Sequence, residues 1–216
     1  MRENDRTLSR RTFIIAGGAL VGVAALGGAG YAAVWAPEPE QPTTKMGVGM
    51  SKVLVVYGTG TGCTAGVAER IGKAMAAKGA SVEVVPAKSA PDPSGYDAVL
   101  VGSGIRAGNW HAPVKEWVVK NAESLKDKPV AFFTACLTMA TDPTKTDEVR
   151  AYTDAIVAET GVKPVDVGLF AGWNEPKEFS FIERTIMKMM KAPEGDFRDW
   201  AAIDAWSEKV AGELLA

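Results

Sequence analysis

The chain has 216 residues, of which 47% are hydrophobic and 23% are charged, and its formal net charge is −2. This length is enough to bury one substantial core. The near-neutral charge argues against a protein that binds nucleic acid, and it singles out no other partner. Two cysteines and one histidine are too few and too widely spaced for a C-x-x-C redox site or a zinc site, so no metal is expected.

Residues 1–36 are expected to form an export signal. The run SRRTFI at residues 9–14 fits the twin-arginine pattern, and an uncharged segment rich in Ala, Gly and Val follows from Thr12 to Ala36. A buried core helix is the alternative, but it leaves the paired arginines unexplained. The segment is about as long as the roughly 20 residues that span a bilayer, so it is either cleaved or retained as an anchor. We therefore expect a periplasmic or other extracytoplasmic protein, associated with a membrane surface through this leader, with residues 37–50 as a linker.

From residue 50 onward, apolar strand patterns alternate with helix patterns. The pattern predicts strands at 52–57, 81–85, 97–102, 129–135 and 164–170, and helices at 64–78, 112–122, 146–160 and 200–215. Asp199 is expected to cap the last helix. The connection at 86–96 is short and rich in proline, which leaves room for only a turn or two of helix. Such alternation predicts an α/β fold with a parallel sheet covered on both faces.

Sheets of this kind bind ligands at the carboxyl ends of their strands, beside a topological switch point. The segment VVYGTGTGCTAGVAERI, residues 55–71, crosses such an end: a β-branched run stops at a loop of Gly, Thr and one Cys, and a helix pattern follows at once. The start of a helix offers unpaired N–H groups and the positive end of its dipole, so an anion site is predicted. The residues expected to hold a phosphate are Thr59, Gly60, Thr61, Gly62, Cys63 and Thr64.

Different phosphate ligands require different loops. A Walker loop needs Lys and then Ser or Thr after its last glycine, and here Cys63 follows Gly62, which excludes it. The spacing of Gly60, Gly62 and Ala65 fits a dinucleotide fingerprint, but that fingerprint also needs an acid at the end of the second strand. The strand at 81–85 ends in Pro-Ala-Lys instead. A phosphate monoester held by hydroxyls and amides remains, beside the alternative of a turn that binds nothing.

The same loop resembles the signature of the flavodoxin superfamily. Two aliphatic residues and an aromatic one precede Thr59, Gly62 and Thr64, and Ala68 and Ile71 follow. The resemblance implies FMN as the cofactor. It also implies a flavodoxin-like, doubly wound, five-stranded parallel sheet of order 2-1-3-4-5 over residues 51–216, behind an N-terminal signal or anchor helix. Twin-arginine export carries folded proteins, which suits a cofactor that is loaded before export.

The segment GSGIRAGNWH at 102–111 is expected to face the flavin ring. Trp110 is either stacked on the isoalloxazine or a partly buried hydrophobic residue. Arg106 lies either near the electron-rich pyrimidine edge of the flavin or in solvent. His111 either caps the next helix or transfers protons; it and Arg106 are the candidate catalytic side chains beside FMN itself. The residues expected around the ring are Ser103, Gly104, Ile105, Arg106, Gly108, Asn109 and Trp110 on one side and Ala135, Cys136 and Leu137 on the other.

This segment also resembles a branch of the superfamily, the menaquinone-dependent protoporphyrinogen dehydrogenases. The pattern of Gly, Ile-Arg, Gly, aromatic and His matches here, and residues 182–199 are similar to a Met/Lys-rich excursion that this branch carries before its last helix. The resemblance implies an FMN-dependent oxidoreductase that passes electrons from a reduced organic donor to a quinone. A non-enzymatic electron carrier between redox proteins is the alternative. A third possibility is an interaction domain that binds no FMN, in which case the match of the glycine loop to the flavodoxin signature is a coincidence.

Two further features stay open at this stage. Cys63 and Cys136 fall in two loops expected to approach one ligand, where they could form a disulfide after export or pack as small residues beside FMN. Residues 179–190 carry apolar side chains at helical spacing together with basic residues. They form either a helix at a membrane surface or quinone entrance, or a helix that covers the sheet edge.

Overall fold

The computed structural model describes residues 38–216, so the expected leader at residues 1–36 lies outside the described part. Residues 38–178 and 193–216 form one compact unit, built around a mostly parallel sheet. Residues 179–192 belong to a second unit and are described by themselves.

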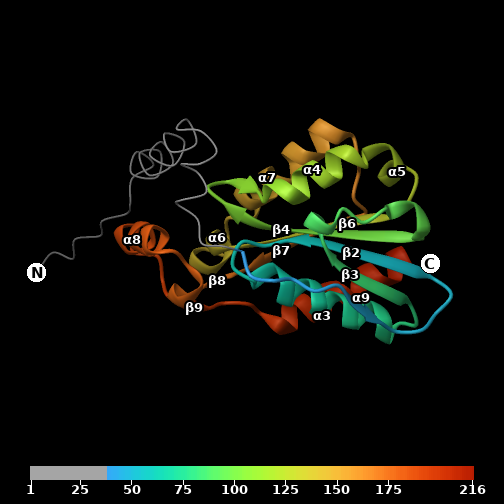
Figure 1. The fold of residues 1–216 in the computed structure, drawn as a ribbon, viewed down its shortest axis with the longest axis horizontal. Coiled ribbons are helices and arrows are strands. Elements are labelled where there is room, and N and C mark those ends of the chain that lie inside the picture. Colours follow the sequence, from blue (N-terminus) through green and yellow to red (C-terminus); the bar gives the residue numbers. More distant parts are fainter. Residues whose placement is uncertain (1–37) are drawn as a thin grey trace, which may run out of the picture. The chain divides into compact units, whose positions relative to one another are not determined.

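Five parallel strands form the centre of the sheet in the order β3-β2-β4-β6-β7 (Figure 1). Their bounds are Lys52–Gly58 for β2, Ser81–Pro86 for β3, Ala98–Arg106 for β4, Val130–Cys136 for β6 and Asp166–Ala171 for β7. The strands are apolar on both faces, and every residue of β6 is buried, as a parallel sheet between two helical layers requires. The predicted order 2-1-3-4-5 is confirmed.

Helices cover both faces of this sheet (Figure 1). On one face α3, Cys63–Ala77, packs beside α9, Trp200–Leu214, over one hydrophobic cluster. On the other face lie α4, α5 and α7, with bounds Ala112–Lys120, Ala122–Lys126 and Thr146–Thr160. Asp199 caps α9 as predicted, because its carboxylate accepts a hydrogen bond of 3.0 Å from the N–H of Ala202. The connection after β3 holds only two 3₁₀ turns, Ala87–Ser89 and Pro93–Gly95, which also agrees with the prediction.

Short strands were not expected. β1, Thr44–Met46, pairs antiparallel with β3, so the expected linker at 37–50 contributes an edge strand instead of being a linker throughout. β5, Asn109–Trp110, pairs with the extended end of β4 and turns the expected loop at 102–111 into a hairpin. Strands of two or three residues are too short for a periodic pattern to reveal. The short helix α6, Leu137–Thr141, follows β6. Two more short strands, β8 at Trp173–Asn174 and β9 at Gly195–Asp196, pair with each other.

The second unit contains α8, Phe181–Met189, inside the range predicted to be helical. Ser180 and Glu183 form a capping box at its start: each side chain accepts a hydrogen bond from the backbone N–H of the other residue. Phe181 and Met189 are 81% and 79% exposed. Across residues 38–216, no helix is both long enough and apolar enough to cross a membrane.

Candidate functional site

The loop between β2 and α3 presents the start of a helix to one edge of the sheet. Gly62 is the N-cap residue, with a φ of 85° that favours glycine. As a glycine, Gly62 has no side chain to cap this helix, and the first turn of α3 carries no acidic residue. The amides and the dipole at the start of α3 are therefore not opposed by a carboxylate of that turn, which suits an anion site.

Residues 59–64, the loop and the first two residues of α3, are here called the phosphate loop, and two of its threonines are almost completely buried. Thr59 and Thr64 are each 1% exposed, and Thr59 Oγ1 accepts a long hydrogen bond of 3.4 Å from the N–H of Thr64. Thr64 Oγ1 itself has no hydrogen-bond partner among residues 38–216. A buried hydroxyl without a partner costs about 1–3 kcal/mol of stability, and such a group is expected where a ligand completes the network. The loop therefore fits the phosphate monoester that the sequence predicts.

The sheet register brings the expected loops together at this edge. Gly58 at the end of β2 pairs with Ser103 on β4, and Gly104 pairs with Ala135 on β6. A Cβ atom on Gly104 would lie 3.0 Å from Thr64 Oγ1, so the β4 backbone directly faces the unpartnered hydroxyl. Because any side chain there would crowd Thr64, the glycine keeps space in front of the phosphate loop.

Arg106 lies against the phosphate loop. A Cβ atom on Gly60 would come within 2.4 Å of Cζ of Arg106, so the guanidinium packs directly on the backbone of Gly60. A guanidinium at this place can offer charge-assisted hydrogen bonds to a phosphate. The expected place of Arg106 beside the pyrimidine edge of the flavin stays a prediction.

The hairpin of β4 and β5 sets the surroundings of Trp110 and Ser103. Trp110 is 5% exposed and packs edge-on against Phe132 with ring centroids 5.4 Å apart, so the structure favours the buried hydrophobic residue over flavin stacking, the two alternatives that the sequence left open. The hydroxyl of Ser103 accepts a hydrogen bond of 2.8 Å from the N–H of His111 and donates one of 3.0 Å to the carbonyl of Gly104. It therefore holds the hairpin closed.

The remaining hairpin residues lie at its turn. Ile105 pairs with Trp110 and is half-buried, while Gly108 has a φ of 76°. Asn109 is exposed and bonds back to the carbonyl of Ala107 at 2.9 Å. These contacts shape the tip of the hairpin, and whether they reach a flavin stays a prediction.

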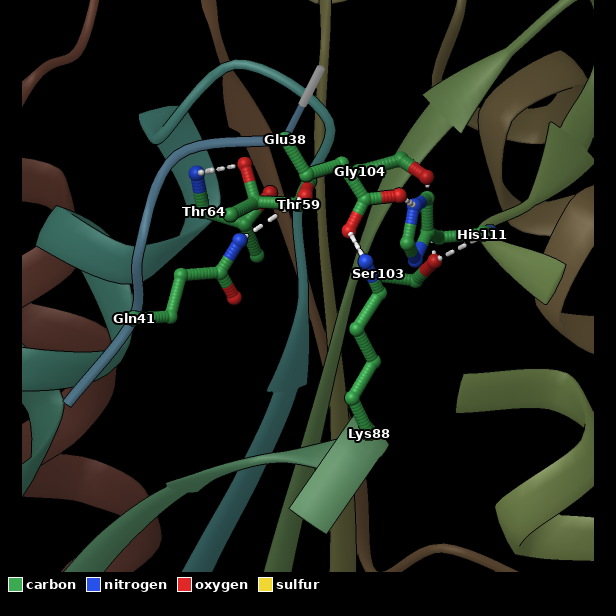
Figure 2. Close-up of polar contacts among 8 residues, drawn as sticks. All are labelled: Glu38, Gln41, Thr59, Thr64, Lys88, Ser103, Gly104 and His111. Carbon is green, nitrogen blue, oxygen red and sulfur yellow. Dashed lines mark hydrogen bonds and ion pairs between the residues drawn. The ribbon is translucent and has the colours of Figure 1, made fainter. Parts of the chain in front are cut away.

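His111 occupies the N-cap position of α4, but its side chain makes no capping hydrogen bond within residues 38–216. Its Nε2 lies 2.8 Å from Oε1 of Glu38 instead (Figure 2). Burial lowers the pKa of His111, although the Glu38 carboxylate acts in the opposite direction. The ring is therefore mainly neutral at neutral pH, in the form that can accept or pass on a proton.

Both cysteines are buried and free, with no disulfide between them. Gly172 lies beside both residues, because a Cβ on it would be 3.5 Å from Sγ of Cys63 and 3.4 Å from the backbone nitrogen of Cys136. Burial raises the pKa of the Cys63 thiol to about 11 and also raises that of Cys136. The thiols therefore stay protonated and pack as small residues. Leu137, the third residue expected here, begins α6 and is half-buried.

The sequence did not predict the part played by Trp173. Its indole N–H donates a hydrogen bond of 3.0 Å to Oγ1 of Thr61, in the middle of the phosphate loop. The guanidinium of Arg198 lies 4.4 Å from the centre of the Trp173 ring and 4.5 Å from that of Trp200, which holds the indole in place by cation–π contacts. Trp173 follows the fifth strand at the same carboxyl edge, and this position is the signal that could have identified it.

These observations define a doubly wound α/β protein with a loop that fits a phosphate at the carboxyl edge of its sheet. Residues 54–200 match the family described as "Flavodoxin domain", and the chain belongs to this family. Membership of this family implies a flavin cofactor, typically FMN. Within residues 38–216, no cluster of three or more His, Cys, Asp or Glu residues could hold a metal ion.

Among characterised relatives, the chain is similar to protoporphyrinogen IX dehydrogenase (quinone) of Escherichia coli (strain K12). The two are 23% identical over 171 residues, which cover 74% of this chain and 94% of the relative. A protein of the same name from Leishmania major is 27% identical over 177 residues, or 76% and 77% of the two chains. A flavodoxin from the domain Archaea has the same fold, with a TM-score of 0.52 and 17% identity over 76% of this chain and 99% of its own.

Proposed function

We propose that the chain is an FMN-dependent oxidoreductase that transfers electrons from a reduced organic donor to a quinone. The buried, unpartnered hydroxyl of Thr64 at the start of α3 is the observation that carries the FMN assignment. The quinone acceptor is supported by the relatives that are named as quinone-linked dehydrogenases. Bound FMN would supply the redox chemistry, while the protein binds and orients it.

The chain's own residues would divide this work. The hydroxyls of Thr59, Thr61 and Thr64, with the amides at the start of α3, bind the phosphate. Trp173 donates to Thr61 Oγ1, which leaves the hydroxyl hydrogen free to point at the phosphate. The guanidinium of Arg106 adds positive charge beside this loop. No covalent role is assigned to the buried thiols.

We also propose that the protein works outside the cytoplasm at a membrane surface. The twin-arginine pattern at residues 9–14 supports export, and the exposed apolar residues Phe181 and Met189 on α8 support contact with a membrane that contains quinone. Lys188 and Arg184 on the same helix would face anionic headgroups. The twin-arginine pattern does not identify the reduced donor, and a porphyrinogen stays one candidate.

The absorption spectrum of the purified protein tests the cofactor first. A flavin-type spectrum, or FMN uptake on reconstitution, is expected, and the absence of both would refute the proposal. Anaerobic reduction followed by mixing with a menaquinone analogue then tests the reaction, for which we expect multiple turnovers with a small-molecule donor. A long-lived one-electron reduced state without quinone reactivity would favour an electron carrier, to which the formal net charge of −2 gives little support.

A further inference from the structure

A short segment ahead of the sheet lies across the phosphate loop. Residues 38–42, Glu-Pro-Glu-Gln-Pro, are here called the strap; β1 follows them at Thr44. The side-chain amide of Gln41 donates a hydrogen bond of 3.1 Å to the carbonyl of Thr59 (Figure 2). A Cβ atom on Gly62, the N-cap of α3, would lie 3.9 Å from Cγ of Pro39. The strap is therefore bonded to the loop that fits a phosphate at Thr59 and lies near it at Gly62.

The first residue of the strap binds the neighbouring loops. The carboxylate of Glu38 pairs with Nζ of Lys88, after β3, and lies 2.8 Å from Nε2 of His111, after β4 (Figure 2). Glu38 is only 22% exposed at its side chain. Its pKa is lowered, since contacts with Lys88 and His111 outweigh the cost of burial. Glu38 therefore stays ionised, and its carboxylate links the loops that follow β3 and β4.

These contacts conflict with occupation of the same edge by FMN. A phosphate must reach the hydroxyls of Thr59 and Thr64, which are 1% exposed in a loop whose Thr59 carbonyl is bonded to the strap. It must also bring its negative charge to an edge where Glu38 already places a carboxylate. The remaining acid of the strap, Glu40, is exposed. The bond of the strap to the same loop and the charge of Glu38 therefore both oppose a docked strap when a phosphate is bound.

We propose that the strap regulates the flavin site as an intramolecular competitor: it is docked when the site lacks FMN and is displaced when the phosphate of FMN binds. This inference rests on the proposed FMN function. Because coupling between two sites is reciprocal, docking of the strap weakens FMN binding by the same factor by which FMN weakens docking. For an exported flavoprotein, the position of the strap would distinguish the loaded from the empty form.

The first test is the dissociation constant for FMN, measured by quenching of flavin fluorescence in the full-length chain. Glu38→Gln keeps the shape of the side chain but removes its charge, and we expect it to bind FMN about five-fold or more tightly than wild type, the lower end of typical coupling. Glu40→Gln makes the same change of charge on the same strap at a residue that binds neither Lys88 nor His111, and it should bind FMN as wild type does. Unchanged or weaker binding by Glu38→Gln would overturn the proposal.

The second test follows the strap itself. A glutamate-specific protease can cut after Glu40 but not at the bond between Glu38 and Pro39, and fragment masses with the Glu40→Gln variant identify the cut. FMN should accelerate this cleavage several-fold, and Glu38→Gln should accelerate it without FMN. Slower cleavage with FMN would mean that the strap closes over the bound cofactor, contrary to the proposal. Equal FMN binding by wild type, Glu38→Gln and Glu40→Gln would refute the regulatory role of the strap alone. No FMN binding by any of the three would refute the proposed FMN function as well.

Discussion

Replacing Thr64 by valine should have opposite effects on stability and on cofactor binding. Valine has nearly the shape of threonine but lacks the hydroxyl, and Thr64 Oγ1 is buried without a partner among the described residues. Because burying an unpaired hydroxyl costs about 1–3 kcal/mol, its removal should leave the free energy of unfolding of the FMN-free protein unchanged or raise it by about 1 kcal/mol. The melting temperature would then rise by about 2–4 °C for a domain of this size.

The same substitution should weaken FMN binding. A hydrogen bond to a charged group contributes about 1.5–3 kcal/mol, and each 1.4 kcal/mol is a factor of ten in affinity. Loss of the bond from Thr64 to the phosphate should therefore raise the dissociation constant for FMN about 10- to 150-fold. Riboflavin lacks the phosphate, so its dissociation constant should be unchanged.

Titration of flavin fluorescence and thermal denaturation measure the two effects on the same samples. Thr153→Val on α7 is the matched control, because Thr153 Oγ1 is also buried and unpartnered in the described chain but lies on another helix. It should reproduce the effect of Thr64→Val on stability and leave both flavins unaffected. Equal losses of FMN and riboflavin affinity, or a clear fall in the melting temperature of Thr64→Val, would refute the assignment of this hydroxyl to the phosphate.

Three further predictions concern other parts of the molecule. Trp173→Phe removes the donor to Thr61 Oγ1, so FMN affinity should fall about two- to ten-fold, the effect of one neutral hydrogen bond, with riboflavin affinity unchanged in the same titration. Gly102→Ala places a Cβ 2.0 Å from the ring of Phe133, and this overpacking should lower the free energy of unfolding by about 1–3 kcal/mol in urea denaturation; an unchanged midpoint would contradict the packing. Since the pKa of Cys63 is about 11, roughly 0.1% of this thiol is ionised at pH 8, and alkylation by iodoacetamide should be far slower in the folded than in the unfolded protein.

The parts of the fold that the sequence predicted are those whose signals are local. β6 is a run of seven buried residues, and α7 shows a regular apolar face that ends at Gly161, so both were recognisable from periodicity. The phosphate loop was recognisable for the same reason. Its glycines, its threonines and the start of α3 lie within a few consecutive residues, and their chemistry needs nothing from elsewhere in the chain.

The sequence left the direction of the Trp110 ring open because this direction depends on a pairing that no local pattern reports. In an irregular loop, an aromatic residue ahead of a helix could point toward a ligand. Here two residues of β5 pair with the end of β4, and this hairpin turns the indole toward Phe132 on the neighbouring strand. Side chains in a strand alternate between faces, so the register of this short pairing decided the direction of the ring.

The contacts around the phosphate loop show the limit of the rule that ligands bind at the carboxyl ends of strands. Applied to all five central strands, the rule would have pointed to Trp173, which follows β7 and bonds to a residue 112 positions earlier. It could not have pointed to Glu38 or Gln41, because they precede the first strand and the rule concerns only segments that leave a strand. A segment entering the sheet reaches the carboxyl edge only through tertiary contacts with Thr59 and His111. If regulation of this site depends on such an entering segment, it can change between relatives while the phosphate loop stays the same.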